Sequence, residues 1–451
     1  MLSQKPRIVV IGAGFAGLKT IRKLASINAE VILIDRNNYH TFIPLLYQVA
    51  TGFIAPEVIT YPLRKYVRSI KNARFIQAEV RRIDLNSKLL YLSSVESAIT
   101  SSIEPTEAID LTYDYLAIAT GSKTRFLGVE GAAEYSLPMR TLEDALRIRD
   151  RVISNFERAT VCNDIDRRRQ LLTLVIVGGG PTGIELAGAL IELVKGTLAR
   201  DYRTINPQEV EIVLIHSGDK LLGYFPSHLS DYTSKQLRRR GVKVHLNSRV
   251  GKVTSSGVEL EDKTTLETAM VIWTAGVKAD YPTAGGKIPT SSKEKIQVNA
   301  TLQLPDYPEV YAIGDVALVK QDGKSLLGIA PEALQQGGTV AKNLRRQLKG
   351  LSPKPFDYFN KGTAAIIARN SGVALLLGRI PLGGFFAWLL WLGIHLYYLP
   401  GITNRFIVLG SWLRDYLTGE RNERQLFDRD KIAWLRIAEL GGDRSFGDKD
   451  K

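Results

Sequence analysis

The sequence predicts an α/β protein with two doubly wound domains, the second inserted into the first, followed by C-terminal amphipathic helices. Two stretches carry most of this prediction, RIVVIGAGFAG at 7–17 and TLVIVGGGPTG at 173–183. Each combines an apolar strand, a glycine-rich loop and the start of a helix. The length of 451 residues agrees, because one compact core usually contains fewer.

The predicted elements follow in order along the chain. Both stretches continue into a helix and a second strand, so that 7–36 and 173–218 form two βαβ units. Their strands are continuous apolar runs rich in valine and isoleucine, which is typical of parallel strands covered on both faces. Further apolar strands that run into a glycine are expected within 113–124, 269–279 and 308–317.

These strands set the expected domain boundaries. The C-terminal region differs from the rest because residues 361–414 contain five lysines and arginines but no aspartate or glutamate. Residues 415–451 are charged and are expected to be peripheral or partly disordered. The expected boundaries are 1–150 and 281–360 for the two parts of the first domain, 151–280 for the inserted domain, and 361–451 for the C-terminal region.

Composition excludes several classes of protein. The hydrophobic fraction of 45% and the charged fraction of 24% are ordinary for a globular chain. The single cysteine, Cys162, excludes an internal disulfide, a CxxC redox pair and a cysteine zinc cluster, and indicates a reducing compartment. The chain enters a strand at Ile8 with no preceding signal peptide, so we expect it on the cytosolic side. We expect no metal site.

The net charge of +14 suits nucleic acid or an anionic membrane surface. The arginine tracts at 167–169 and 238–240 are interpreted as solvated helix surface. The sequence has no nucleic-acid-binding signature, so we expect no nucleic-acid partner and favour a membrane.

The first glycine loop fits the phosphates of a dinucleotide. Gly12, Gly14 and Gly17 form G-x-G-x-x-G between a strand and a helix. The first glycine permits the tight turn, the second lets the backbone approach a pyrophosphate, and the third allows close packing of helix on strand. The helix N-terminus adds free N–H groups and positive potential. Asp35 ends the next strand, where a carboxylate accepts hydrogen bonds from ribose hydroxyls.

The second loop repeats this pattern with Gly178, Gly180 and Gly183, but its strand-end position holds His216 instead of an acid. A carboxylate there would repel a 2′-phosphate, whereas histidine removes the repulsion and attracts the phosphate when protonated. One interpretation is therefore a site that accepts NADPH as well as NADH. The other is a neutral histidine that caps a surface loop.

Two loops predict two dinucleotides, and the common pair is a flavin with a nicotinamide. Hydride transfer requires a donor ring stacked on an acceptor ring, and the protein supplies that alignment. Gly314 and Asp315, within YAIGDVA, fit the flavin half, with Asp315 placed to hold the ribityl chain.

The layout resembles the two-dinucleotide-binding, glutathione-reductase-like flavoproteins, with Rossmann-like domains for FAD and NAD(P). Three segments narrow the resemblance to type II NADH:quinone dehydrogenases of bacterial and plastid type. Residues 37–64 are similar to the segment after the first acidic strand, 328–344 to the flavin- and quinone-facing helix, and 385–418 to the membrane-docking tail. The resemblance covers about residues 6–420.

The resemblance implies roles for individual residues. For FAD it implies Gly12, Gly14, Gly17, Asp35, Thr120, Gly121 and Asp315; for NADH it implies Gly178, Gly180, Gly183, Glu185, Ala275 and Gly276. Gln335 and Gln336, with Ala333, would lie by the flavin ring at the quinone pocket. The family often carries an earlier glutamine, and here Pro331 stands at that position. The alternative for the two glutamines is a solvated helix face.

The implied reaction has two halves: NADH gives hydride to FAD, and two electrons and protons then pass to a membrane quinone without proton pumping. We expect Glu185 to be kept ionised by the helix dipole, because it lies in the first turns of the second helix. It would position the nicotinamide or help deliver a proton toward the quinone, or else serve stability alone.

Two other functions share the glycine loops. One is a non-enzymatic flavoprotein that senses redox state by binding NAD(P)H. The other is an NAD(P)H reductase of a small electron-carrier protein of ferredoxin or rubredoxin type. A disulfide relay is excluded because the chain has one cysteine.

The apolar tail determines the expected location. No charged residue occurs between Ile380 and Asn404, a length that can span a bilayer. Prolines, glycines and His395 interrupt the run, so we favour helices that lie on the membrane over a spanning helix or a buried or dimer-forming one. Residues 381–418 are expected to bind an anionic lipid surface on the cytoplasmic side, as part of a homodimer. Trp388, Trp391, Tyr397 and Tyr398 suit the interface, and Arg405 and Arg414 follow on the next helix.

Overall fold

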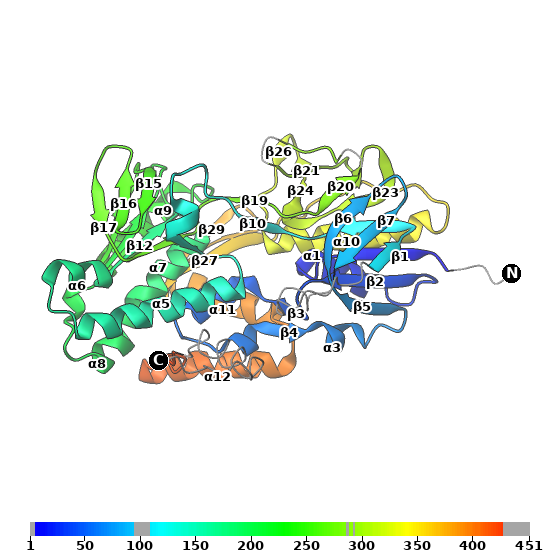
Figure 1. Cartoon of the computed structure of the whole chain (residues 1–451). Coiled ribbons are helices and arrows are strands. Elements are labelled where there is room, and N and C mark those ends of the chain that lie inside the picture. Colours follow the sequence, from blue (N-terminus) through cyan, green and yellow to red (C-terminus); the bar gives the residue numbers. More distant parts are fainter. Residues whose placement is uncertain (1–4, 94–108, 286–287, 292–293, 427–451) are drawn as a thin grey trace, which may run out of the picture.

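The computed structural model describes residues 5–93, 109–285, 288–291 and 294–426. Figure 1 shows two domains side by side, with helix α12 (Ile402–Thr418) along the lower edge of the molecule. The predicted α/β fold with one domain inserted into another is confirmed.

The first domain is built on a six-stranded sheet in the order β22-β23-β9-β1-β2-β5. Its central strands are parallel, and the pairing of β9 with β23 joins segments from either side of the inserted domain. The helices α1 (Phe15–Lys23) and α10 (Ala330–Gln347) pack on each other against this sheet. The strands are β1 (Arg7–Ile11), β2 (Glu30–Asp35), β5 (Ala73–Gln77), β9 (Tyr115–Ile118), β22 (Gln303–Leu304) and β23 (Tyr307–Ala312).

Smaller elements complete this domain. A four-stranded sheet contains β20 (Thr283–Gly285), β6 (Glu79–Asp84), β7 (Leu89–Ser93) and β8 (Ile109–Thr112). Two-stranded pairs join β3 (Tyr39–Thr41) to β4 (Thr60–Pro62), β21 (Ile296–Gln297) to β24 (Ala317–Leu318), and β25 (Lys320–Gln321) to β26 (Lys324–Ser325). The short helices are α2 (Leu46–Ala50) and α3 (Leu63–Val67).

The inserted domain has a parallel five-stranded sheet in the order β11-β18-β12-β13-β14. Its strands are β11 (Ser136–Pro138), β12 (Thr173–Val177), β13 (Glu211–Ile215), β14 (Val242–His245) and β18 (Met270–Trp273). Its helices are α4 (Ala132–Tyr135), α5 (Leu142–Thr160), α6 (Ile165–Leu172), α7 (Pro181–Leu193), α8 (Ala199–Asp201) and α9 (Ser227–Arg240). A three-stranded sheet adds β15 (Val250–Thr254), β16 (Gly257–Leu260) and β17 (Thr265–Glu267).

The boundary expected at residue 150 lies too late in the chain. Strand β11 pairs with β18 of the inserted domain, and helix α5 follows it directly. Residues 136–150 therefore belong to the inserted domain, with 136–138 in its sheet and 142–150 in α5. The two connections between the domains run side by side, as β10 (Ser122–Thr124) pairs antiparallel with β19 (Val277–Ala279).

The C-terminal region is a packed part of the molecule. It begins with an antiparallel sheet of β27 (Gly362–Ala368), β28 (Ser371–Leu376) and β29 (Ile380–Gly384), followed by α11 (Phe385–Tyr398) and α12. Strand β27 packs on α7 so closely that a Cβ on Gly188 would lie 1.7 Å from the Ile367 carbonyl oxygen. Trp391 and Val408 are fully buried in the core shared with α2, α5 and α7.

Two expectations for this region change. Residues 415–426 are not a loose charged tail, because Asp415 and Arg421 are buried; residues 427–451 lie outside the described part of the chain. Trp391, expected at a membrane interface, instead faces the core. Within the described residues, no helix combines the length and the apolar character that crossing a bilayer requires.

Adjacent glycines on α10 test the packing of the first domain. A Cβ on Gly337 would lie 2.3 Å from the Ala16 carbonyl oxygen of α1, whereas a Cβ on Gly338 meets open space. We expect Gly337→Ala to lower the free energy of unfolding by about 1–3 kcal/mol through overpacking. Gly338→Ala should raise it by up to about 1 kcal/mol through helix propensity. Thermal and urea unfolding measure both; equal shifts for the two variants would contradict the close helix crossing.

Candidate functional site

The first glycine loop forms an open cradle at the N-terminus of α1. Gly12 has a φ of 99° and donates its N–H to the Ile34 carbonyl oxygen at 2.8 Å. A Cβ on Gly17 would lie 1.9 Å from the Gly12 carbonyl oxygen, so only glycine permits this turn. A Cβ on Gly14, the N-cap residue, meets open space, and no side chain caps the helix. The free N–H groups are thus directed at a space suited to phosphate.

Asp35 lies beside this cradle. Its carboxylate accepts the N–H groups of Ala13 at 2.6 Å and Asn37 at 2.8 Å, which fixes the loop to the end of β2. Burial raises the pKa of Asp35, and these two hydrogen bonds oppose the rise. Each carboxylate oxygen keeps a lone pair, so the group can still accept a ribose hydroxyl.

The remaining residues implied for FAD surround the same edge of the sheet. Asp315 accepts a hydrogen bond from the Ser122 hydroxyl at 2.9 Å and an ion pair from Arg140. The hydroxyl of Thr120 is buried and has no hydrogen-bond partner within the described residues, and Gly121, with a φ of 79°, faces open space. A buried hydroxyl without a partner, beside a helix N-terminus without a cap, fits a polar molecule bound along this edge of the sheet.

The second loop repeats the cradle. Gly178 has a φ of 124°, and a Cβ on Gly183 would lie 1.9 Å from the Gly178 carbonyl oxygen. Gly180 is the uncapped N-cap residue of α7, with open space in front of it. Ala275 and Gly276 follow β18 next to this loop, where the Ala275 carbonyl oxygen accepts the Trp273 indole N–H at 2.6 Å.

His216 lies beneath the second loop. Its Nδ1 accepts the Gly179 N–H at 3.2 Å, and a Cβ on Gly179 would meet the imidazole ring at 2.6 Å. Burial lowers the pKa of His216, so the ring is neutral at neutral pH. The ring therefore lacks the positive charge that would attract a 2′-phosphate; His216 replaces the usual carboxylate at this position, although the Asp219 carboxylate is near enough to act on the ring.

Glu185 has an environment that the sequence did not indicate. Its side chain is buried, and its Oε1 accepts the Ile366 N–H at 3.3 Å and the Trp391 indole N–H at 3.1 Å. Burial raises the pKa of Glu185 to about 8 despite these two donors. The expectation that the helix dipole keeps it ionised is wrong, because desolvation outweighs the dipole. Both donors belong to the C-terminal region, so the carboxyl group faces β27 and α11.

The two glutamines of α10, Gln335 and Gln336, bind different segments of the chain. Gln336 is buried, and its Oε1 accepts the Gly314 N–H at 2.7 Å beside Ala333. Gln335 instead binds the backbone of Phe359, donating to its carbonyl oxygen at 2.8 Å and accepting its N–H at 3.0 Å. Neither forms a free solvated face. The structure thus brings only Gln336 to the Asp315 loop.

A large cavity lies between the inserted domain and the C-terminal helices. Its volume is about 630 Å³, and Glu185 forms part of its wall. The wall is mainly apolar, with polar groups from Gln48, Glu192, Arg369, Asp415 and Arg421. Among the polar residues of the wall, the sequence indicated only Glu185, because no local motif marks the others. The apolar lining comes from Tyr47, Phe53, Ala189, Ile366, Ile367, Ala368, Phe385, Trp388, Leu389, Leu392, Gly393, Leu396, Leu409, Trp412, Leu413 and Tyr416.

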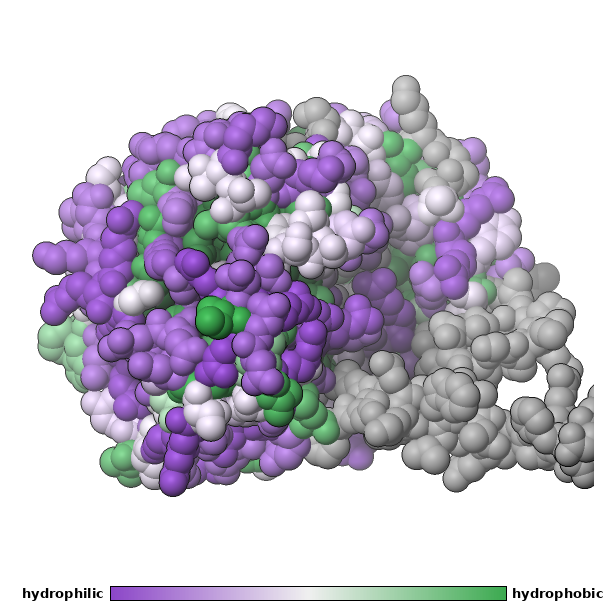
Figure 2. Space-filling view, turned by 60° about the vertical axis from the view of Figure 1, so that its left-hand side comes forward, coloured by the Kyte–Doolittle hydropathy of each residue, from purple (hydrophilic) through white to green (hydrophobic). Residues whose placement is uncertain are grey.

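The cavity borders a strongly apolar surface. Leu389, Leu409 and Leu413 line the cavity and are 51%, 47% and 58% exposed, so its wall continues onto the outside of α11 and α12. By contrast, the face of the inserted domain that Figure 2 brings forward is largely hydrophilic. The other exposed apolar side chains of the two helices are Phe385, Phe386, Ile394, Tyr397, Tyr398, Ile402, Phe406, Ile407, Tyr416 and Leu417.

Comparison with known proteins shows the family that this chain resembles in sequence and fold. Residues 6–337 match the family described as pyridine nucleotide-disulphide oxidoreductase. A type II NADH:quinone oxidoreductase (Ndh) of Mycobacterium tuberculosis is 33% identical over 97% of this chain and 94% of its own length. An internal alternative NAD(P)H-ubiquinone oxidoreductase of Arabidopsis thaliana is 25% identical over 92% of this chain and 85% of its own. The solved structure of NDH2 from Plasmodium falciparum in complex with NADH has a TM-score of 0.84 at 21% identity, and the match covers 94% of this chain and 100% of that one.

The raised pKa of Glu185 predicts a pH-dependent cost in stability. Between pH 4.5 and about 8 the folded protein keeps this group protonated while the unfolded chain ionises. Its contribution to stability is therefore fully present below pH 4.5 and is lost as the pH rises toward 8. Glu185→Gln removes this titration. We therefore expect the melting temperature of the variant, relative to that of the wild type, to increase as the pH rises from 5 to 8. A difference that stays constant with pH would contradict the buried neutral carboxyl group.

Proposed function

This chain belongs to the type II NADH:quinone oxidoreductases of the pyridine nucleotide-disulphide oxidoreductase family, and we propose that it oxidises NADH and reduces a membrane quinone, without pumping protons. The single observation that carries the proposal is Glu185. It joins helix α7, which begins at the second glycine loop, to an apolar cavity beside the exposed helices. The alternatives of a redox sensor or a reductase of a carrier protein give no reason for this cavity.

FAD is the resident cofactor implied by the family, and the residues present fit it. Gly12, Gly14, Asp35, Thr120 and Asp315 would hold it, with the orphaned Thr120 hydroxyl and the open cradle at Gly14 as the supporting observations. Bound FAD supplies a group that accepts hydride from NADH and passes electrons on. The second cradle, at Gly178, Gly180 and Gly183, would receive the nicotinamide dinucleotide.

Glu185 supplies the proton that the reaction consumes. The balanced reaction, NADH with one proton and a quinone giving NAD⁺ and a quinol, takes one proton from solvent. With a pKa of about 8, the Glu185 carboxyl is protonated at neutral pH and close to the value suited to an acid catalyst. Since it lines the cavity, it can donate to a quinone oxygen there. Gln336 fixes the Gly314 backbone and so supports the Asp315 loop.

The outer face of α11 and α12 docks on the cytoplasmic side of a membrane. Its exposed aromatic and aliphatic side chains each contribute roughly 25 cal/mol per Å² of surface transferred out of water. Arg414, on α12, would add about 1 kcal/mol on an anionic lipid surface. A quinone would then enter the cavity directly from the bilayer, past Leu409 and Leu413.

The proposed reaction is tested on protein purified from membranes. We expect NADH oxidation in the presence of a short-chain quinone. We expect Glu185→Gln to slow reoxidation of the reduced flavin by quinone about 10²–10⁴-fold, the usual contribution of a general acid. Flavin reduction by NADH should change little, because both donors to Glu185 lie on the cavity side. Stopped-flow absorbance separates the halves; unaltered quinone rates would remove Glu185 from the mechanism.

The second cradle accepts NADPH as well as NADH, since His216 stands where a carboxylate would repel the 2′-phosphate. We expect kcat/KM for the two substrates to lie within about tenfold of each other, a difference of 1.4 kcal/mol. His216→Glu should lower the value for NADPH and spare NADH. Strong NADH selectivity that His216→Glu leaves unaltered would exclude this proposal.

Membrane docking is tested by point substitutions. Deletion of 381–451 is unsuitable, because it would also remove the buried Trp391 and strand β29. Phe386, Phe406 and Leu417 are 69%, 68% and 74% exposed and do not line the cavity. The triple change to glutamate should release the protein from anionic vesicles in a flotation assay. The control, Val161→Glu with Ile165→Glu, alters exposed apolar residues at the end of α5 and the start of α6, outside α11 and α12, and should leave binding intact.

A further inference from the structure

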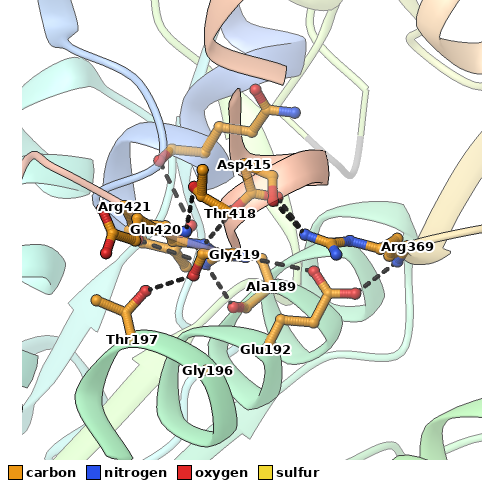
Figure 3. Close-up of polar contacts among 12 residues, drawn as sticks. Ala189, Glu192, Gly196, Thr197, Arg369, Asp415, Thr418, Gly419, Glu420 and Arg421 are labelled. Carbon is orange, nitrogen blue, oxygen red and sulfur yellow. Dashed lines mark hydrogen bonds and ion pairs between the residues drawn. The ribbon is translucent and has the colours of Figure 1, made fainter. Parts of the chain in front are cut away.

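The chain turns back after α12 and runs across α7. We call residues 419–426 the C-terminal strap. Gly419, with a φ of 65°, ends the helix, and its carbonyl oxygen accepts a hydrogen bond from the Thr197 hydroxyl at 3.2 Å (Figure 3). Farther along, the Glu423 N–H donates to the Gly52 carbonyl oxygen at 3.3 Å. The strap is therefore fixed both to the π-helical turn (Val194–Leu198) that continues α7 and to the segment after α2.

Arg421 is the buried centre of the strap, with its side chain only 3% exposed. Its guanidinium donates to the carbonyl oxygens of Ala189 at 2.8 Å and Thr51 at 3.5 Å. It also pairs with Glu192 at 3.3 Å and Asp415 at 3.6 Å (Figure 3). The group stacks over the Phe53 ring, 5.0 Å from its centroid. These partners lie on α7, after α2 and on α12, so one side chain joins three walls of the cavity.

Arg369 completes the cluster from the turn after β27. Its guanidinium pairs with Asp415 at 2.8 Å, and its backbone N–H donates to Glu192 at 2.5 Å (Figure 3). Two arginines thus face two carboxylates, and the ion cluster (Glu192, Arg369, Asp415 and Arg421) has no net charge. A balanced cluster has no excess charge with which to bind an ion, and each member is already paired. Its arrangement instead joins structural elements.

All four residues of the ion cluster line the cavity that contains Glu185. Glu185, Ala189 and Glu192 are spaced four and three residues apart on α7, so they share one face of the helix. The proton-donating end of the cavity and the ion cluster are therefore set at a fixed separation by one helix. Within the described residues, α12 is joined to α7 and the helical turns that follow it through Asp415, through the strap, and through Arg200, which donates to the Thr418 and Gly419 carbonyl oxygens.

We propose that Arg421 is a positioning residue that fixes the width of this cavity by holding α12 and the segment after α2 against α7. It touches no reacting group in the proposed reaction. The inference rests on the proposed function only in taking a quinone as the cavity's ligand. When the contacts of Arg421 are lost, the three walls of the cavity separate. Only a fraction of the molecules then has the arrangement that binds quinone. Apparent affinity falls by that same fraction, while the bound complex reacts as before.

The experiment compares Arg421→Met and Arg421→Lys in the full-length flavoprotein. The control is Arg424→Gln, which removes an ion pair with Asp201 from the same strap, outside the cavity. We expect Arg421→Met to raise KM for a short-chain quinone about tenfold or more, with kcat at saturation and flavin reduction by NADH within about twofold. Arg421→Lys keeps the positive charge but not the forked geometry of the guanidinium. Its KM should therefore lie between those of the wild type and Arg421→Met. Arg424→Gln should match the wild type.

A binding assay accompanies the kinetics. Trp388 and Trp412 line the cavity, so quenching of tryptophan fluorescence by the quinone reports occupancy without turnover. We expect the quenching midpoint to shift with KM, and millimolar guanidinium to restore both in Arg421→Ala. If Arg421→Met fails to fold, the KM of Arg421→Lys and the rescue of Arg421→Ala by guanidinium test the inference instead. Unchanged quinone affinity, or an equal loss in flavin reduction, would overturn the inference. A wild type that neither binds nor reduces quinone would instead overturn the proposed function.

Discussion

The hydrogen bond between the Trp391 indole and the Glu185 carboxyl connects the parts of this protein that must act together. Trp391 is on α11, whose opposite face is exposed and apolar, and Glu185 is on α7, which starts at the second glycine loop. A buried carboxyl without partners is costly, and here two N–H donors satisfy it while burial keeps it neutral. The indole is held in turn by a stacked His395, with 3.7 Å between ring centroids. The orientation of α11 and the environment of the acid are therefore set by the same contact.

The charges around the cavity are arranged to leave that acid uncharged. Arg369 and Arg421 also line the cavity, and an unpaired cation near Glu185 would favour its ionised form. Both arginines are instead neutralised by Asp415 and Glu192 at the other polar part of the wall. The low dielectric of the apolar lining then acts on Glu185 almost alone. The ion pairs at one part of the wall thus preserve the proton affinity of Glu185 at another part.

Local patterns in the sequence predicted the local structure well. The glycine loops, the strands beside them and the insertion follow from short motifs, because each depends on residues within one βαβ unit. Asp35, Thr120 and Asp315 lie at one edge of the sheet, since parallel strands end on the same side.

What the sequence did not predict depends on contacts between distant segments. Helix α11 is apolar on every side, so nothing in its pattern marked Trp391 as the inward residue. The charges at 415–421 resembled a tail because their partners, Glu192 and Arg369, are far away in the chain. The pKa of Glu185 was misjudged for the same reason: burial is a tertiary property. Strand β11 is only three residues long and carries no signal of its own sheet.

The inserted topology also dictates the order in which the molecule is completed during synthesis. Strand β9 pairs with β23, although Leu116 and its partner Val310 are separated by the whole inserted domain. Asp315 likewise meets Ser122 and Arg140 only after that domain has been made. A nascent chain that has emerged only as far as residue 300 therefore has a complete second cradle but an unfinished first one. The second cradle can therefore form early on the ribosome, whereas completion of the first cradle is a late, long-range event in maturation.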